Sequence, residues 1–185
     1  MSKPTDRFAA IQAQTNVHRA RHGCGAYPFD DGIVLGVISA AVRPKRILEL
    51  GTALGYTSLW LAHGAPEATV DTVDLDAEHL RLTHDNAVKF GCGDRIRGHQ
   101  GEFDAVLPTL DPPYDLAFFD GSSPRPSYLD QFRRLLRPRG VLVSANLHFR
   151  DPDTAAFRGL LFEGDAWMST YLGDDREVAM SVRIA

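Results

Sequence analysis

Residues 46–61, RILELGTALGYTSLWL, constrain the fold of this chain more than any other segment. An apolar, strand-like run leads into a turn with Gly51 and Gly55, and a helix-like run starts at Tyr56. Glycine in such a turn lets the backbone approach a ligand closely and adopt φ values that a side chain forbids. A strand, a glycine turn and a helix in this order predict a parallel α/β unit with a ligand at the turn.

An acidic residue further along completes this pattern. A second apolar run, residues 68–75, places Asp74 23 positions after Gly51. A carboxylate at the end of the second strand can accept hydrogen bonds from ribose hydroxyls, so we predict a nucleoside site at the sheet edge. The turn lacks the dinucleotide pattern G-x-G-x-x-G and the Walker lysine and serine, and the chain has no Tyr-x-x-x-Lys pair. An NAD(P)-dependent oxidoreductase is therefore a distant alternative.

The segments ELGTALGYTS and TVDLD resemble the class I S-adenosylmethionine-dependent methyltransferases, in particular the catechol/caffeoyl-CoA type O-methyltransferases. The first motif of that family reads close to LELGxxxGYS. The resemblance continues through YDLAFFDG and GVLVSANL and covers roughly residue 28 to the C-terminus. It implies S-adenosylmethionine as the cofactor and S-adenosylhomocysteine as the product. It says much less about the methyl acceptor.

The composition is that of a globular protein, with 44% hydrophobic and 24% charged residues, and we expect one domain over residues 1–185. No apolar run approaches the ~20 residues that span a bilayer, and the N-terminus has no signal-peptide core. Cys24 and Cys92 form no C-x-x-C pair. We therefore expect a cytoplasmic protein with reduced thiols and no membrane partner.

The net charge of −4 argues against a general nucleic-acid binder. The charge is uneven, because residues 1–46 hold seven Lys and Arg against three Asp and Glu, which leaves −8 for the rest. This basic segment is either a solvated helix face, which we favour, or a surface for an anionic acceptor.

Strands and helices alternate after two N-terminal helices. We expect helices at 5–20, 31–41, 56–63, 77–90, 103–110, 127–137 and 154–162, and strands at 46–50, 69–75, 95–99, 115–119 and 140–145. Asp76 is a plausible N-cap, and Gly91 a C-terminal stop, for the helix between them. Two last runs, 166–172 and 177–184, lie too close together for a crossover and must be antiparallel. The fold class is α/β: a doubly wound, mostly parallel seven-stranded sheet with a C-terminal antiparallel hairpin.

The cofactor should lie beyond the carboxyl ends of the strands, at the switch point between the first and fourth strands. The resemblance implies cofactor contacts by Glu49, Gly51, Thr52, Gly55, Tyr56, Thr57, Asp74, Leu75, Gly101, Glu102, Phe103 and Asp120. In the family, the residue at Glu49 supports the loop or the cofactor's amino group, and a serine at the Thr57 position contacts its carboxylate. The alternatives are that Glu49 only braces the loop and that Phe103 belongs to the core.

One part of the family pattern is incomplete. Catechol-type members hold Mg²⁺ with an aspartate ending the fourth strand and an Asp-Asn pair ending the fifth. Asp120 and Asn146 match, but Ala145 replaces the second aspartate, and Ser123 stands where the family has its catalytic lysine. Either the metal is abandoned, which we favour, or a neighbour such as Asp151 or Asp153 completes a shifted site.

Without that metal, His148 is the best substitute base, because it follows the fifth strand and an ordinary histidine titrates near neutral pH. Together with Asp120 and Asn146 it would face the acceptor. The alternative is an exposed loop histidine. Tyr27 and Trp60 could line an acceptor pocket, although aromatic residues near helix starts more often belong to the core.

Two further patterns are weaker. His18-x-x-x-His22 with Cys24 has metal-ligand spacing on a helix, but such pairs are usually surface residues and no other ligand is near in sequence, so we predict no metal site there. The segment 111–114, DPPY, matches the motif of amino-methyltransferases. It precedes the expected fourth strand instead of following it, so we predict an ordinary turn.

We therefore expect an S-adenosylmethionine-dependent O-methyltransferase for a small hydroxylated acceptor, without the complete Mg²⁺ site. A tRNA-modifying methyltransferase of the same fold is an alternative, supported by Arg133, Arg134, Arg137 and Arg139. A non-catalytic cofactor-binding protein is another. The loop after the fifth strand is short, so a lid must come from residues 1–42 or from a second subunit, which makes a homodimer possible.

Overall fold

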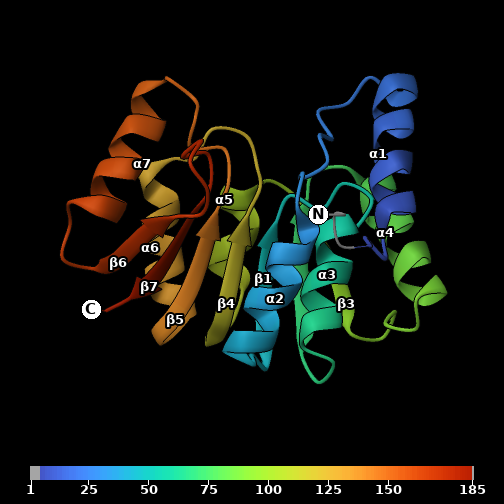
Figure 1. The fold of residues 1–185 in the computed structure, drawn as a ribbon, viewed down its shortest axis with the longest axis horizontal. Helices are drawn as coiled ribbons and strands as arrows, with labels where there is room; N and C mark the ends of the chain where they lie inside the picture. The colour runs from blue at the N-terminus through green and yellow to red at the C-terminus, as the bar shows by residue number, and fades with distance from the viewer. Residues whose placement is uncertain (1–4, 185) are drawn as a thin grey trace.

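The computed structural model describes residues 5–184 of the chain, and its centre is one seven-stranded sheet with the order β3-β2-β1-β4-β5-β7-β6 (Figure 1). The strands are β1 (Arg46–Leu50), β2 (Thr69–Asp74), β3 (Ile96–Gln100), β4 (Tyr114–Phe119), β5 (Leu136–Ser144), β6 (Trp167–Tyr171) and β7 (Ala179–Arg183). The first five strands are mutually parallel, and β7 pairs antiparallel with both β5 and β6. This confirms the predicted doubly wound sheet with its C-terminal hairpin.

Helices cover both faces of the sheet. The helices are α1 (Ala9–His22), α2 (Gly32–Val42), α3 (Tyr56–Gly64), α4 (Ala77–Lys89), α5 (Phe103–Val106), the 3-10 helix η1 (Leu107–Thr109), α6 (Pro126–Leu135) and α7 (Pro152–Phe162). Side chains of α1 to α4 share one hydrophobic cluster with the sheet, and those of α5 to α7 share a second cluster on the other face. None of the helices within residues 5–184 has the length and apolar character needed to cross a bilayer.

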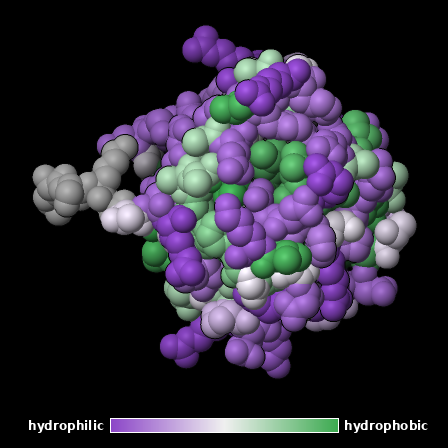
Figure 2. Space-filling model, turned by 90° about the vertical axis from the view of Figure 1, so that its right-hand side faces the viewer, coloured by the Kyte–Doolittle hydropathy of each residue, from purple (hydrophilic) through white to green (hydrophobic). Residues whose placement is uncertain are grey.

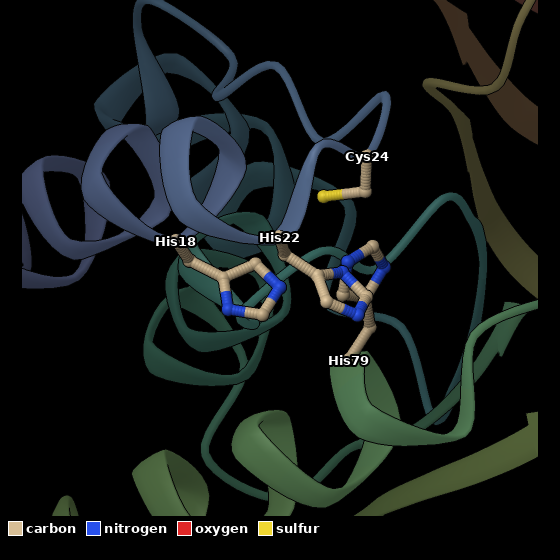
Figure 3. A group of neighbouring side chains, drawn as sticks. All are labelled: His18, His22, Cys24 and His79. Carbon is tan, nitrogen blue, oxygen red and sulfur yellow. The ribbon is translucent and has the colours of Figure 1, made fainter.

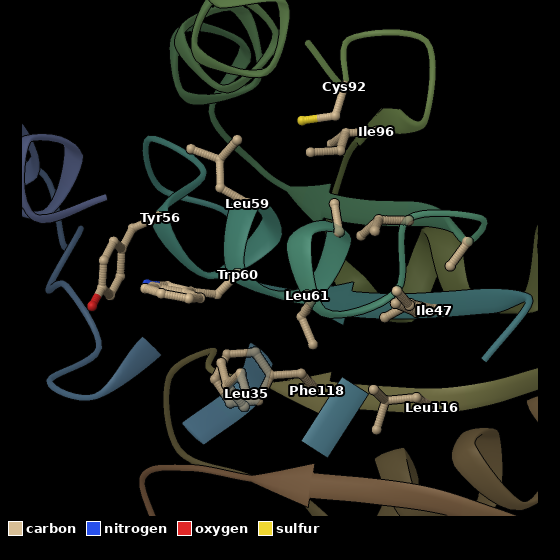
Figure 4. Close-up of a cluster of buried hydrophobic side chains, with 14 of the residues drawn as sticks. Leu35, Ile47, Tyr56, Leu59, Trp60, Leu61, Cys92, Ile96, Leu116 and Phe118 are labelled. Carbon is tan, nitrogen blue, oxygen red and sulfur yellow. The ribbon is translucent and has the colours of Figure 1, made fainter. Parts of the chain in front are cut away.

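The first cluster fixes the N-terminal helices on the sheet. Leu35 of α2 is fully buried and lies against Phe118 of β4, close to Leu61 of α3 (Figure 4). The Tyr56 hydroxyl accepts a hydrogen bond from the Gly32 backbone N–H at 3.2 Å and donates one to Asp6 Oδ2 at 2.6 Å. These contacts hold Asp6 and the start of α2 beside α3.

The outer surface of α1 and α4 is mostly polar, in contrast to the hydrophobic cluster beneath these helices (Figure 2). Figure 2 views this side of the molecule, where polar and charged side chains cover most of the surface and apolar residues lie among them. Such a surface agrees with solvated helix faces.

The predicted capping residues of α4 are also confirmed. The Asp76 side chain accepts from the Glu78 backbone N–H, and Gly91 has a left-handed φ of 75° just after the helix.

The first helix, predicted at 5–20, is Ala9–His22, and two further predicted boundaries were wrong, both next to prolines. The helix predicted at 127–137 ends at Leu135, and β5 begins at Leu136, earlier than the predicted 140, because Pro138 disfavours helical geometry in the residue before it. The helix predicted at 103–110 is split into α5 and η1, with Pro108 in the second piece. The DPPY segment is a turn leading into β4, at the sheet edge opposite the β4 carboxyl end, as predicted.

We predict that Leu35→Ala lowers the free energy of unfolding by about 2–5 kcal/mol, because it leaves a cavity under α2. Val37→Ala on the same helix is the control. Val37 is 62% exposed, and its truncation should change stability by only about 0.5 kcal/mol. Urea unfolding followed by circular dichroism measures both values. Equal losses in the two variants would contradict the packing of α2 described above.

Candidate active site

A cleft of about 1330 Å³ opens at the carboxyl ends of the parallel strands, where β1 and β4 are neighbours. Its walls are the loops after β1 to β5, residues 24–31 and 34 from the N-terminal part, and the turn between β6 and β7. This volume exceeds the range that one drug-sized ligand usually fills, so a nucleoside cofactor and a second molecule have room together. The predicted switch point therefore lies at a cleft of this size.

The glycine turn is shaped by the close approach of two loops. Gly51 has a φ of 93°, and a Cβ atom there would lie 2.4 Å from the Asp120 carbonyl oxygen, so only glycine fits. Gly55 has a φ of 85° and precedes α3, whose N-terminus has no side-chain cap. Tyr56 and Thr57 of its first turn line the cleft. Backbone N–H groups at such a helix start favour an anionic partner, such as the carboxylate of an amino acid.

Glu49 lies beneath this turn and does not line the cleft. It is fully buried, and its carboxyl group accepts hydrogen bonds from Thr57 Oγ1 and Thr72 Oγ1, each at 2.6 Å, and from Ser58 Oγ. Burial raises the pKa of Glu49 to about 7, although the three hydroxyl donors oppose the shift. The geometry is that of a brace between β1, β2 and α3.

Asp74 ends β2 and lines the cleft, as predicted, but its carboxylate also has a structural role. Its Oδ2 accepts from the backbone N–H groups of Thr52 and Ala53, each at 3.1 Å, and its Oδ1 accepts from the Asp76 N–H at 2.9 Å. Oδ1 also lies 3.2 Å from His79 Nδ1. Burial alone would raise the pKa of Asp74, but these donors hold it below its usual value, so the group is ionised.

The wall after β3 is aromatic. Gly101, Glu102 and Phe103 line the cleft, and the ring of Phe103 meets Phe119 and Tyr128 edge to face at 6.3 and 6.0 Å. Phe103 is half-buried, so it both packs against the second hydrophobic cluster and presents a surface to the cleft. An apolar ring of this kind suits the flat face of an adenine.

The opposite wall carries Asp120 and Asn146. The Asn146 side-chain amide donates to Asp120 Oδ1 at 3.2 Å and to the Gly121 carbonyl oxygen. Burial raises the pKa of Asp120 to about 7, and the nearby carboxyl groups of Glu49 and Asp30 act in the same direction. Ala145 beside them is 3% exposed and offers only a methyl group.

These residues do not fit the magnesium site of catechol-type enzymes. Asn146 presents a donor to Asp120, whereas Mg²⁺ requires several oxygen ligands. Asp151, considered as a substitute ligand, caps α7 by accepting from the Thr154 N–H at 2.9 Å and its hydroxyl at 2.8 Å. Neither Asp151 nor Asp153 lines the cleft.

His148 lies on the cleft wall just beyond β5. Its side chain is 44% exposed, its Nδ1 is 3.7 Å from Glu177 Oε2, and its ring lies beside that of Phe149. Tyr27 also lines the cleft and is 71% exposed, with Arg19 over its ring. Trp60, in contrast, is buried in the first cluster against Phe8.

Of the remaining residues predicted to contact the cofactor, Thr52 and Leu75 line the cleft and Gly55 does not. One residue of this region was not foreseen. His79 in the first turn of α4 binds Asp74 and lies within reach of His18, His22 and Cys24. No sequence pattern indicated this contact, because His79 lies more than 50 positions from the other three.

Comparison with known proteins identifies relatives of this arrangement. A model of a family described as "Methyltransferase domain" matches residues 48–146. A Mycobacterium sp. (strain JLS) protein assigned to the O-methyltransferases is 35% identical over 80% of this chain and 70% of its own length. A catechol O-methyltransferase of Mycobacterium tuberculosis is 33% identical over 66% of this chain and 57% of its own length.

Solved structures share the fold. The O-methyltransferase TomG from Streptomyces achromogenes, in complex with SAM, superposes with a TM-score of 0.83 at 21% identity, over 100% of this chain and 92% of that one. An O-methyltransferase from Bacillus cereus in complex with SAH superposes with a TM-score of 0.81 at 22% identity, over 97% and 92%.

The buried carboxyl groups make stability depend on pH. The pKa values of Glu49 and Asp120 are raised to about 7, so between about pH 5 and 8 the native state binds more protons than the unfolded chain. We expect the free energy of unfolding to fall by roughly 2–4 kcal/mol as pH rises through this window. Urea unfolding at several pH values measures the slope.

Glu49→Gln tests the origin of this slope, because it removes one of the groups that titrate in this window. We expect a flatter pH dependence for this variant. Glu67→Gln, at an exposed position, is the matched control and should keep the wild-type slope. An unchanged slope in Glu49→Gln would show that Glu49 does not titrate in this range.

Proposed function

The chain belongs to the O-methyltransferases among the class I S-adenosylmethionine-dependent methyltransferases, and from this premise we propose that it methylates a hydroxyl group of a small molecule without a magnesium ion. The observation that carries the proposal is the cleft at the switch point. One side of the cleft has a glycine turn, an ionised carboxylate and an aromatic ring. The other side is a polar wall that lacks one ligand of the family's magnesium site.

The first side suits the cofactor. S-adenosylmethionine, when bound, supplies an activated methyl group on a sulfonium centre. The start of α3 would bind its amino-acid carboxylate, Asp74 its ribose hydroxyls, and Phe103 its adenine. Because Asp74 also accepts the loop N–H groups of Thr52 and Ala53, a ribose contact requires it to share its oxygens between the loop and the ligand.

The second side suits the acceptor. Methyl transfer requires the acceptor oxygen in line with the methyl carbon at about 3 Å, and removal of the hydroxyl proton makes that oxygen a better nucleophile. Asp120 and Asn146 would orient the hydroxyl group. His148, held beside Glu177, would take the proton. The exposed ring of Tyr27 offers an apolar surface for an aromatic or otherwise flat acceptor.

The arrangement of arginines does not favour a tRNA substrate. Arg137 and Arg139 lie at the amino end of β5, whereas the cleft lies at the carboxyl ends of the strands. Arg137 pairs with Asp115 at 2.6 Å, and Arg134 donates to the carbonyl oxygens of Leu107 and Leu110. Two of the four arginines thus have structural partners, and the group faces away from the proposed reaction site.

The first test of the proposal is binding of S-adenosylhomocysteine, measured by calorimetric titration. We expect one site per chain and an affinity at least tenfold weaker in Asp74→Asn, because a charge-assisted hydrogen bond contributes about 1.5–3 kcal/mol. Asp85→Asn, at an exposed position of α4, should bind like the wild type. Absence of binding to well-folded wild-type protein would refute the cofactor assignment.

The second test is turnover of phenolic and catecholic acceptors in buffers freed of divalent ions, with and without added Mg²⁺. We expect equal rates in both. His148→Gln should lower kcat by about 100-fold or more if His148 removes the proton, with His84→Gln, an exposed histidine of α4, as the control. A strict requirement for Mg²⁺ would contradict the metal-free proposal. Cofactor binding without turnover of any acceptor would favour the non-catalytic alternative.

A further inference from the structure

Four side chains from distant parts of the sequence meet beside the cofactor cleft. His18 and His22 come from the last turns of α1, Cys24 from the segment just after it, and His79 from the first turn of α4 (Figure 3). One ligand atom of each lies within 4.8 Å of those of the other three. We propose that these residues form a binding site for a transition-metal ion of the zinc type.

Local geometry explains how three ligands come from seven residues. His18 and His22 are four positions apart, so they lie one above the other on the same helix face, with ring centroids 4.8 Å apart. Gly23 then adopts a left-handed φ of 69° and ends α1, which lets Cys24 turn back toward the helix face. The His18 ring also lies 5.2 Å from the His79 ring.

The strongest indication of a ligand is a pair of buried nitrogen atoms without hydrogen-bond partners. His79 is only 6% exposed, and its Nε2 has no hydrogen-bond partner. His18 Nε2 is also buried without one. Such atoms lose their hydration without compensation, which costs free energy. A metal ion between them would accept a lone pair from each nitrogen and remove this cost.

The surroundings of His79 match those of a metal ligand. Its Nδ1 lies 3.2 Å from Asp74 Oδ1, so a proton on Nδ1 leaves the Nε2 lone pair for the ion. Metal-binding histidines regularly donate their other ring N–H to a carboxylate in this way. Asp76 adds a second carboxylate, 3.5 Å from His22 Nδ1 and 3.7 Å from His79 Nε2. The negative charge around the cluster therefore favours a cation.

The ligand types select the metal. Three imidazoles and one thiol are the nitrogen and sulfur donors that zinc prefers, and four protein ligands make a closed structural site. Ligand atoms around tetrahedral zinc lie about 3.3–3.6 Å apart, so the cluster would contract slightly on binding. His22 is exposed, which leaves it room to adjust. Binding would release two protons to solvent, one from the Cys24 thiol and one from Nε2 of the protonated His79 ring.

The proposed ion would have a structural role at the edge of the cofactor cleft. It would join the end of α1 to the start of α4 and, through His79, to Asp74. Residues 24–31, which follow directly, form one wall of the cleft. The proposed ion would thus fix that wall to the sheet. It differs from the magnesium site of catechol-type enzymes in its residues, its ligand chemistry and its side of the cleft.

The test uses full-length protein without a polyhistidine tag, loaded with one equivalent of Zn²⁺ or Co²⁺ and passed through a desalting column. We expect close to one zinc per chain by elemental analysis and a melting temperature several degrees above that of the metal-free protein. With Co²⁺ we expect the strong visible absorption of a tetrahedral site and a thiolate-to-metal charge-transfer band. A free-metal spectrum, or no metal retained after desalting, would overturn the proposal.

Variants separate this site from adventitious binding. Cys24→Ser should lose the charge-transfer band, and His22→Ala should weaken metal affinity at least tenfold in competition with a chromophoric chelator. His84→Ala, an exposed histidine on the same helix as His79, should match the wild type. Circular dichroism of the metal-free variants checks that they fold. Folded Cys24→Ser and His22→Ala with wild-type spectra and affinities would also overturn the proposal.

Discussion

The carboxylate of Asp74 is the point on which the functional end of this molecule depends. It accepts backbone N–H groups from the loop after β1 and from the start of α4, and it binds His79. Loops have few such contacts of their own, so a single buried anion with several donors sets their relative positions. The shape of the cofactor wall therefore follows from the same group that is expected to bind the ribose.

The other carboxyl groups of the site are in a different electrostatic state. Burial and then the nearby Glu49 carboxyl group disfavour ionisation of Asp120, and its pKa is raised to about 7. A third carboxylate beside them would need a cation for balance. Ala145 avoids that charge, and the Asn146 amide donates to Asp120 instead of joining it as an oxygen ligand. The missing aspartate and the amide orientation are thus consistent with each other.

The sequence predicted what depends on local pattern. The parallel sheet and the hairpin followed from alternation and connection lengths, and the glycine turn followed from spacing, because each is encoded within a few dozen residues. Boundaries failed at Pro108 and Pro138, where a proline competes with apolar periodicity. The partners of Asp74 and the approach of His79 to His18 were not predictable, since both depend on how α1 and α4 pack in three dimensions.

The two sets of candidate metal ligands differ in the kind of metal ion that they would bind. The acceptor wall offers oxygen atoms with one ligand missing, so it disfavours a hard cation such as Mg²⁺. The cluster at α1 and α4 offers nitrogen and sulfur atoms, which bind zinc far better than magnesium. Because Asp74 contacts His79 on one side and the glycine turn on the other, an ion in the cluster would order the cofactor wall. The ion would affect methyl transfer by fixing the position of the cofactor wall, and not by activating the acceptor oxygen.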